Sequence, residues 1–118
     1  MPYVDGCVLP VPVKNIAAYR RIAKKAGAIW REYGALEYKE WVAEDMNAHE
    51  LVPFTRSVQT KDDETVIFAY IVFKSRAHRD RVNAKVMQDP RLASMGPEGA
   101  PFDHTRMVYG GFKLLVDA

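Results

Sequence analysis

The residues of this sequence that could do chemistry are few and scattered. Two carboxylates, Asp5 and Glu40, stand in segments that are otherwise largely apolar. A carboxyl group buried among apolar side chains has a raised pKa and can serve as a general acid or base. Each carboxylate could instead be paired with an arginine, for example Arg56 or Arg106, and simply fix a dimer. We favour this structural interpretation because buried carboxylates usually have partners.

Cysteine and histidine offer no strong metal site or nucleophile. Cys7 is the only cysteine, so an intramolecular disulfide and a thiolate-rich zinc site are both impossible. His49, His78 and His104 are 29 and 26 residues apart, and neither spacing is that of a helical ligand pair or a short chelating loop. We therefore expect no metal and no cofactor, and an inert buried thiol at Cys7.

Six elements must position these side chains. Strand-like runs rich in β-branched and aromatic residues cover residues 3–12, 36–44, 64–74 and 106–116. Helical periodicity covers residues 16–33 and 76–88. We expect the prolines at positions 10 and 12 to end regular pairing in the first strand. The connections are a long polar loop at 45–61 and the Gly/Pro-rich GPEGAP at 96–101.

The two helices are predicted from apolar stripes and capping residues. Apolar side chains of the first helix recur every three or four residues, at Tyr19, Ala23, Ala26, Trp30 and Tyr33. Asn15 is placed to cap its start and Gly34 to end it. Ser75 can cap the second helix, whose basic residues, Arg79 among them, are interpreted as a solvated face. Its inward residues are expected to be Ala77, Val82 and Val86.

The order of these elements is β-α-β-β-α-β. Two right-handed crossovers onto one antiparallel sheet give the ferredoxin-like arrangement, an α+β fold with two helices on one face of four strands. The chain has 118 residues, of which 48% are hydrophobic. That length is sufficient for one domain, residues 1–118, with a core that needs no metal or disulfide.

Both faces of the strand at 64–74 are apolar, so both faces must be shielded from water. Its residues form two alternating sets, Val66, Phe68, Tyr70 and Val72 on one face and Ile67, Ala69, Ile71 and Phe73 on the other. A strand with one solvated face should instead alternate apolar with polar residues. Since helices cover one face only, the other must meet a second chain or a flat aromatic ligand.

A candidate pocket follows if Ile67 and Ala69 face the helices. Phe68 and Tyr70 then lie on the other face, the barrel side of a dimer. We expect this side to be shared by residues of the neighbouring strands, namely Tyr3, Asp5, Cys7, Tyr38, Glu40, Met107 and Tyr109. His104 and Arg106, at the mouth of the last strand, complete the candidate site. Such a pocket suits a small apolar or aromatic metabolite, and the residues assign no reaction to it.

Five segments carry a resemblance to a known family: PYVDG at 2–6, YRRIAKKAG at 19–27, YGALEYKEW at 33–41, KVMQDPRL at 85–92 and FDHTRMVYGGF at 102–112. With these segments the chain resembles the YbaA-like bacterial family, a group of unknown function placed in the dimeric α+β barrel superfamily. The resemblance implies a homodimer closed by two facing sheets, and it implies no established reaction. Small monooxygenases, dehydratases and haem-degrading enzymes of that superfamily are connected to it by fold only.

Two alternative functions stay open. An RNA-recognition motif has the same order of elements and stacks bases on alternate rings of its third strand. Phe68, Tyr70 and the first-strand Tyr3 would supply those rings. Val66 and Ile67 stand where that motif has a cation and a glycine, so a nucleic-acid partner is the less favoured interpretation. The second alternative is a structural or stress-related dimer without any ligand.

Charge and hydropathy limit the partners further. The chain has 17 Lys and Arg against 15 Asp and Glu, and this net charge of +2 neither demands nor forbids a polyanion. No apolar run approaches the roughly 18 residues of a membrane helix. The start, MPYVDG, has neither a basic leader nor an apolar signal core. We therefore expect a cytoplasmic protein that does not enter the membrane.

Overall fold

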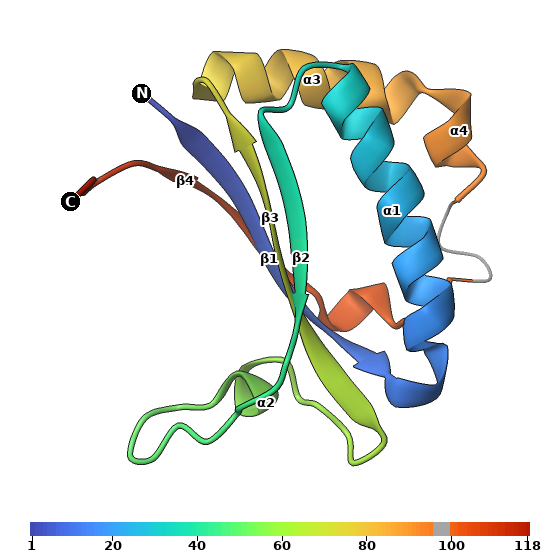
Figure 1. The fold of residues 1–118 in the computed structure, drawn as a ribbon, viewed down its shortest axis with the longest axis vertical. Helices are drawn as coiled ribbons and strands as arrows, with labels where there is room; N and C mark the ends of the chain where they lie inside the picture. The colour runs from blue at the N-terminus through green and yellow to red at the C-terminus, as the bar shows by residue number, and fades with distance from the viewer. Residues whose placement is uncertain (96–99) are drawn as a thin grey trace.

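Four antiparallel strands form one sheet, two long helices pack on one of its faces, and a short third helix lies on the same side beyond them (Figure 1). The structure is a computed structural model that describes residues 1–95 and 100–118. In chain order the elements are β1 (Tyr3–Pro12), α1 (Ile16–Glu32), β2 (Glu37–Val42), α2 (Phe54–Ser57), β3 (Glu64–Phe73), α3 (Arg76–Gln88), α4 (Pro90–Ala93) and β4 (Val108–Lys113). Most of the expected GPEGAP connection lies outside the described residues.

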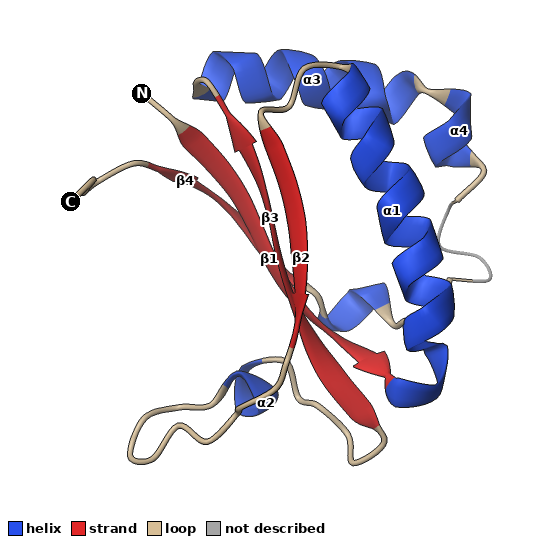
Figure 2. Cartoon of the chain, viewed as in Figure 1, coloured by secondary structure: helices blue, strands red, loops and turns tan. Residues whose placement is uncertain are grey.

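The sheet has the strand order β2-β3-β1-β4, and every neighbouring pair is antiparallel. This confirms the predicted α+β class, with a four-stranded antiparallel sheet and helices between the strands. Figure 2 shows that the short α2 interrupts the loop expected at 45–61, on the opposite side of the sheet from α1 and α3. The last strand is shorter than predicted because a 3-10 turn at His104–Arg106 precedes it.

The prolines of β1 do not end its pairing, and that prediction is wrong. Pro10 lies opposite Val66, and Pro12 lies opposite Glu64 of β3. The N–H of Val13 donates to Asp63 O at 2.9 Å, so by the period of two the odd residues of β1 point their N–H groups toward β3. The prolines occupy even positions, where the missing N–H would point away from β3. Since β4 pairs only as far as Val8, no ladder bond is lost.

Helix α1 begins and ends at signals that are only partly those expected. Gly34 has a φ of 114°, and this left-handed residue ends the helix as predicted. Asn15 does not cap the helix, because its Nδ2 donates instead to Pro101 O at 2.9 Å. This bond ties the start of α1 to the segment before β4. Tyr19 of the predicted stripe is buried and its other members are half-buried, while Ile29, which the stripe did not include, is also buried.

Helix α3 keeps its predicted cap but turns one basic residue inward. Ser75 Oγ accepts from the N–H of His78 at 3.1 Å, as expected for an N-cap. Val82 and Val86 are buried, whereas Ala77 is exposed. Arg79 is not part of a solvated face, because only 18% of its side chain is exposed and it points toward β1.

The core lies between the sheet and the helices in two neighbouring clusters. One joins the middle of β1 and β3 to the start of α1 through Leu9, Val11, Tyr19, Ile67 and Ala69. The other joins the end of β3 to α1 and α3 through Ile29, Ala35, Phe73, Val82 and Val86. The odd residues of both long strands supply the sheet side of this core, because directly paired residues point to the same face. Among the described residues, no helix is long and apolar enough to cross a membrane.

The other face of the sheet is apolar and largely uncovered. Its residues, from the even positions of three strands, include Val4, Val8, Phe68, Tyr70, Val72, Val108 and Phe112. Phe68 is 45% exposed and Phe112 is 63% exposed. The chain covers one end of the face itself, where the Phe54 ring meets Phe68 edge-on. We call this surface the open face. Its apolar character confirms the prediction that β3 is apolar on both sides.

Phe73 offers a direct test of the core. Its side chain is fully buried between the sheet and the helices. Replacing it by alanine removes a large ring and leaves a cavity, so Phe73→Ala should lower the free energy of unfolding by roughly 3–5 kcal/mol. Phe73→Leu retains most of the volume and should cost clearly less. Denaturant titration of the three proteins measures both values. Equal losses in the two variants would contradict the tight packing described.

Candidate functional site

A cavity of about 360 Å³ lies between the helix-covered face of the sheet and α1, α3 and the segment before β4. Apolar and aromatic side chains make up most of its wall. They are Cys7, Tyr19, Ile22, Ala23, Ala26, Trp30, Tyr38, Ala69, Ile71, Met87, Leu92, Phe102, Met107 and Tyr109. The polar exceptions are Asp5, Glu40 and Asn83, and Gly6 and Tyr70 also contribute to the lining. An apolar hollow with a few convergent polar groups is the usual form of a small-molecule site.

The strand register brings the two carboxylates to this cavity. Asp5 pairs with Ile71 of β3, and Ile71 pairs with Tyr38 of β2. One pleat further, Ala69 is the partner of both Cys7 and Glu40. Residues joined in this way point to the same face of a sheet. The cavity floor is therefore a row of β1, β3 and β2 residues, all of which lie under the helices.

Glu40 accepts hydrogen bonds from two phenols. Tyr38 Oη donates to its Oε2 at 2.6 Å, and Tyr19 Oη, from α1, donates to its Oε1. Burial, followed by the negative charge of Glu40, raises the pKa of both tyrosines well above the usual range. Both phenols therefore keep their protons at every physiological pH and hold the carboxylate from two sides. Among the described residues, no lysine or arginine forms an ion pair with Glu40.

Asp5 is more deeply buried and has different partners. Only 6% of the residue is exposed. Its Oδ2 accepts from Asn83 Nδ2 at 3.1 Å, while Asn83 Oδ1 accepts from the Trp30 indole at 2.9 Å. Arg79 Nε lies 3.7 Å from Asp5 Oδ1, which is an ion pair without a hydrogen bond. The prediction that an arginine pairs with Asp5 is confirmed, but that arginine is Arg79 rather than Arg56 or Arg106.

Close packing at two glycines holds these groups in place. A Cβ at Gly27 of α1 would lie 2.7 Å from the Tyr38 ring, so the helix can approach β2 only where there is no side chain. A Cβ at Gly111 of β4 would lie 2.2 Å from Tyr3 Oη. This space lets the Tyr3 hydroxyl accept from Arg79 Nη2 at 2.9 Å. Gly111 therefore marks a close approach of the last strand to the Tyr3 side chain, which any larger residue would obstruct.

Cys7 sits between the two carboxylates but is not activated. Burial, with a smaller contribution from the charges of Glu40 and Asp5, raises the pKa of its thiol to about 11. The thiolate needed for nucleophilic attack is therefore scarce at neutral pH. In the described part of the chain, no group of three histidine, cysteine, aspartate or glutamate side chains could hold a metal ion.

The predicted pocket divides between two faces. Tyr3, Asp5, Tyr38, Glu40 and Tyr109 lie on the helix-covered face. Phe68 and Tyr70 project onto the open face, where Tyr70 Oη donates to Glu37 at 3.1 Å. The expectation that Phe68 and Tyr70 share one barrel side with the other predicted pocket residues is therefore wrong. The alternation of side chains along each strand was predicted correctly. The prediction of which residues on neighbouring strands share a face was not.

The same register separates the rings expected for RNA binding. Tyr3 pairs with Phe73, which is buried under the helices. Phe68 and Tyr70 have the opposite parity and lie on the open face, 6.2 Å apart between ring centroids. The first-strand ring of the proposed stacking trio is therefore on the wrong side of the sheet. Leu9, on the same face of β1 as Tyr3, is likewise buried in its own chain.

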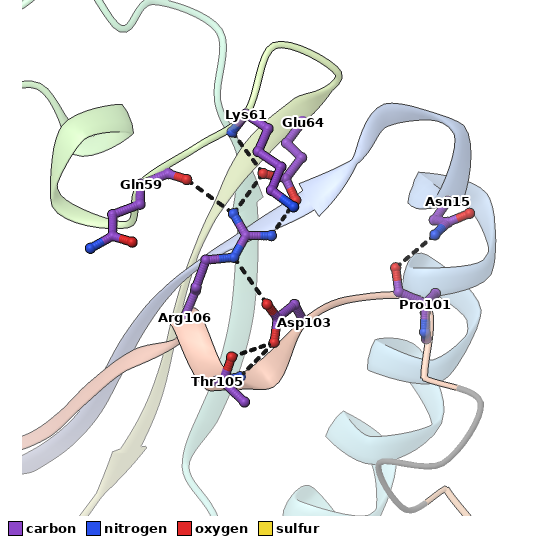
Figure 3. A network of polar contacts seen from close by, with 8 residues as sticks. All are labelled: Asn15, Gln59, Lys61, Glu64, Pro101, Asp103, Thr105 and Arg106. Atoms are coloured by element: carbon purple, nitrogen blue, oxygen red, sulfur yellow. Dashed lines mark hydrogen bonds and ion pairs between the residues drawn. The ribbon is translucent and has the colours of Figure 1, made fainter.

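The remaining two site residues, His104 and Arg106, lie outside the cavity wall. Figure 3 shows the polar network around Arg106. Arg106 holds Glu64 with two hydrogen bonds, one from Nη1 at 2.7 Å and one from Nη2 at 2.5 Å. Its Nε donates to Asp103, which in turn accepts from Thr105. His104 is exposed on the same 3-10 turn. This network joins the entry of β4 to the start of β3 and is structural.

Comparison with known sequences places the chain in a family. A family model described as "Protein of unknown function (DUF1428)" matches residues 2–104. The chain belongs to the DUF1428 family. It is 41% identical over 117 residues to the uncharacterized protein YbaA of Escherichia coli strain K12, an alignment that covers 99% of each chain. The same figures hold for the uncharacterized protein YbaA of Shigella flexneri. The YbaA-like resemblance is thus confirmed.

The sequence analysis missed several groups that shape this DUF1428 cavity. Trp30 and Tyr19 were assigned to an apolar stripe, although each carries a polar tip that needs a partner when buried. That requirement was a usable signal, and the partners are Asn83 and Glu40. Arg79 could not have been found in this way. Its neighbours in the sequence are solvated, and only the packing of α3 on β1 turns it inward.

The Arg106 network predicts how this DUF1428 protein responds to acid. Arg106 lowers the pKa of Glu64 from 4.5 to about 2, and Thr105 together with Arg106 lowers that of Asp103 from 3.8 to about 2. Carboxylates with depressed pKa values stabilise the fold above their ordinary pKa values, and this contribution is lost as pH falls. The melting temperature should therefore fall between about pH 4.5 and pH 2.

Arg106→Gln removes the shared cation and serves as the comparison. We expect this variant to be less stable at neutral pH and to lose less of its melting temperature on acidification over the same interval. Calorimetry at a series of pH values measures both effects. Parallel acid profiles for the two proteins would contradict a role for Arg106 in the pKa shifts.

Proposed function

We propose that this DUF1428 protein binds a small apolar or aromatic metabolite in the cavity under α1. The observation that carries the proposal is the mainly apolar cavity of about 360 Å³ onto which Asp5 and Glu40 converge. Its volume falls within the range of known small-molecule sites. The apolar wall would supply binding energy by excluding water, and the carboxylates would orient the polar group of the metabolite.

The groups that line the cavity suit binding and, at most, proton transfer. Glu40 is held by two neutral phenols and could accept or share a proton with a bound molecule. The Cys7 thiol is not activated for attack on a substrate. We therefore assign a ligand class and leave the reaction unassigned.

We also propose that two copies associate through their open faces and form a ferredoxin-like dimeric α+β barrel. The strand order β2-β3-β1-β4 with helices on one face supports the ferredoxin-like assignment. Apolar side chains on the open face support the dimer, since Trp41, Phe68 and Val108 are 52%, 45% and 51% exposed. A contiguous apolar surface of this kind on a small domain marks an interaction site.

Magnitudes favour a stable dimer. Burial of each large apolar side chain contributes roughly 1.5–3 kcal/mol before association costs are subtracted. A two-fold axis would count each such contact twice. The C-terminal residues after β4 would add to the contact, since Leu115 and Val116 are 93% and 73% exposed. We propose the cytoplasm as the compartment, and the free thiol of Cys7 is compatible with it.

The dimer predicts the effect of a charge on the open face. The wild-type protein should have twice the mass of one chain in size-exclusion chromatography with light scattering at micromolar concentration. Phe112→Lys places an ammonium group on the proposed interface and should give a monomer or an aggregate. Ala84→Lys, on the exposed side of α3, is the control and should leave the dimer intact. A wild-type monomer at every concentration would reject the proposed barrel.

The cavity predicts which variants lose ligand binding. In a thermal-shift screen of small aromatic and apolar compounds, a bound compound at 100 times its Kd should stabilise the protein by about 2.7 kcal/mol. Ala26→Trp would fill the cavity from α1 and should abolish the shift, whereas Ala17→Trp on the exposed side of α1 should not. If no compound shifts the wild-type melting temperature, the alternative of a ligand-free structural dimer is preferred.

A further inference from the structure

We infer that the ligand of this cavity is an organic cation, an apolar and preferably aromatic body that carries an ammonium group bound by Glu40. The inference rests on the proposed function and specifies its ligand class. It follows from three independent properties of the cavity wall, which are its charge, its unsatisfied hydrogen-bond acceptor and its aromatic rings.

The charge of the wall is negative. Asp5 and Glu40 are its charged residues, and among the described lining residues there is no lysine or arginine. The negative charge of Asp5 is met by Arg79, which stands 3.7 Å away behind the wall. Glu40 receives only two neutral hydroxyl donors. Among the described residues, no cation forms an ion pair with Glu40. The cations Arg20, Lys24 and Arg31 of α1 line a separate hollow beside it. A positive ligand in the cavity would therefore give Glu40 the ion pair that it lacks.

The second property is a buried acceptor that lacks a donor. Asp5 Oδ1 is buried and has no hydrogen-bond partner in the described part of the chain. Arg79 Nε, 3.7 Å from this oxygen, is itself buried without a hydrogen bond. Such atoms are rare in native proteins and cost free energy when left unmatched. Both charged groups of the cavity wall are hydrogen-bond acceptors, so a ligand matches the wall better with donors, which an ammonium or guanidinium group has and a carboxylate or phosphate lacks.

The third property is the set of rings around the carboxylates. Trp30 and Tyr38 lie with their ring centroids 6.0 Å apart, and Tyr19 packs edge-on against Phe102 at 5.4 Å. Aromatic faces attract cations, and the attraction grows when water is excluded. The raised pKa values of Tyr19 and Tyr38 keep these rings neutral. An anion would instead be placed beside two carboxylates without a cation on the wall.

Three probes of nearly equal size and different charge test the inference. They are 2-phenylethylamine, 2-phenylethanol and 3-phenylpropanoate, titrated calorimetrically into the wild-type protein at neutral pH. A charge-assisted hydrogen bond contributes about 1.5–3 kcal/mol, so we expect the amine to bind at least about 10-fold more tightly than the alcohol. The propanoate should bind most weakly of the three.

Glu40→Gln identifies the carboxylate responsible. Its amide oxygen can still accept from a phenol, so the fold should be retained and circular dichroism can verify this. We expect the variant to lose about 10-fold or more in affinity for the amine and less than about twofold for the alcohol. Glu37→Gln is the matched control, because Glu37 lies on the same strand but on the open face beside Lys39. It should leave all three affinities unchanged.

The contrary outcomes are distinct. If the alcohol or the propanoate binds as tightly as the amine, the inference that the ligand is a cation is wrong. The proposed ligand site would still be supported. If Glu37→Gln weakens the amine and Glu40→Gln does not, the amine binds on the open face and the inference is overturned. If no probe binds and the compound screen is also silent, both the inference and the proposed ligand site fail.

Discussion

The register between β1 and β3 is the constraint on which both surfaces of this protein depend. It places Asp5, Cys7 and Leu9 under the helices, and it leaves Val4 and Val8 on the open face. Because side chains alternate with a period of two, a slip of one residue would exchange the two sets. Asp5 would then lie on the open face and leave the cavity, whereas Glu40 is placed by the separate register between β2 and β3. The close fit of Gly111 against Tyr3 and the ion pair of Asp5 with Arg79 both oppose such a slip.

The two carboxylates of the cavity are stabilised in different ways, and this difference separates structure from function. Asp5 is joined through Asn83 to the Trp30 indole and faces Arg79, so it links β1 to α3 and α1. Glu40 links β2 to α1 through Tyr19, and among the described residues no cation forms an ion pair with it. A buried pair mainly specifies how elements dock, whereas a carboxylate solvated by neutral dipoles remains available to a ligand.

The proposed dimer and the proposed ligand site use opposite faces of one sheet. The open face gathers Phe68, Val108 and Phe112 for a second copy, while the cavity lies between the same sheet and its own helices. Each protomer would therefore hold its own ligand, and the two proposals can fail separately. β3 connects them physically, since Phe68 projects toward the partner and its neighbour Ala69 forms part of the cavity floor.

Local sequence determined the helices and strands of this protein. Only the tertiary structure decided which of their side chains lie together on each face of the sheet. Periodicity identified α1 and β3, while Gly34 and Ser75 marked helix ends, because these signals act over a few residues. Asp5 and Glu40 were also recognised as unusual carboxylates. Which strand faces match is decided by register across strands, so Phe68 was wrongly grouped with Asp5. The partner of Asp5 is Arg79, 74 residues away in sequence, and only the docking of α3 on β1 brings the two charges together.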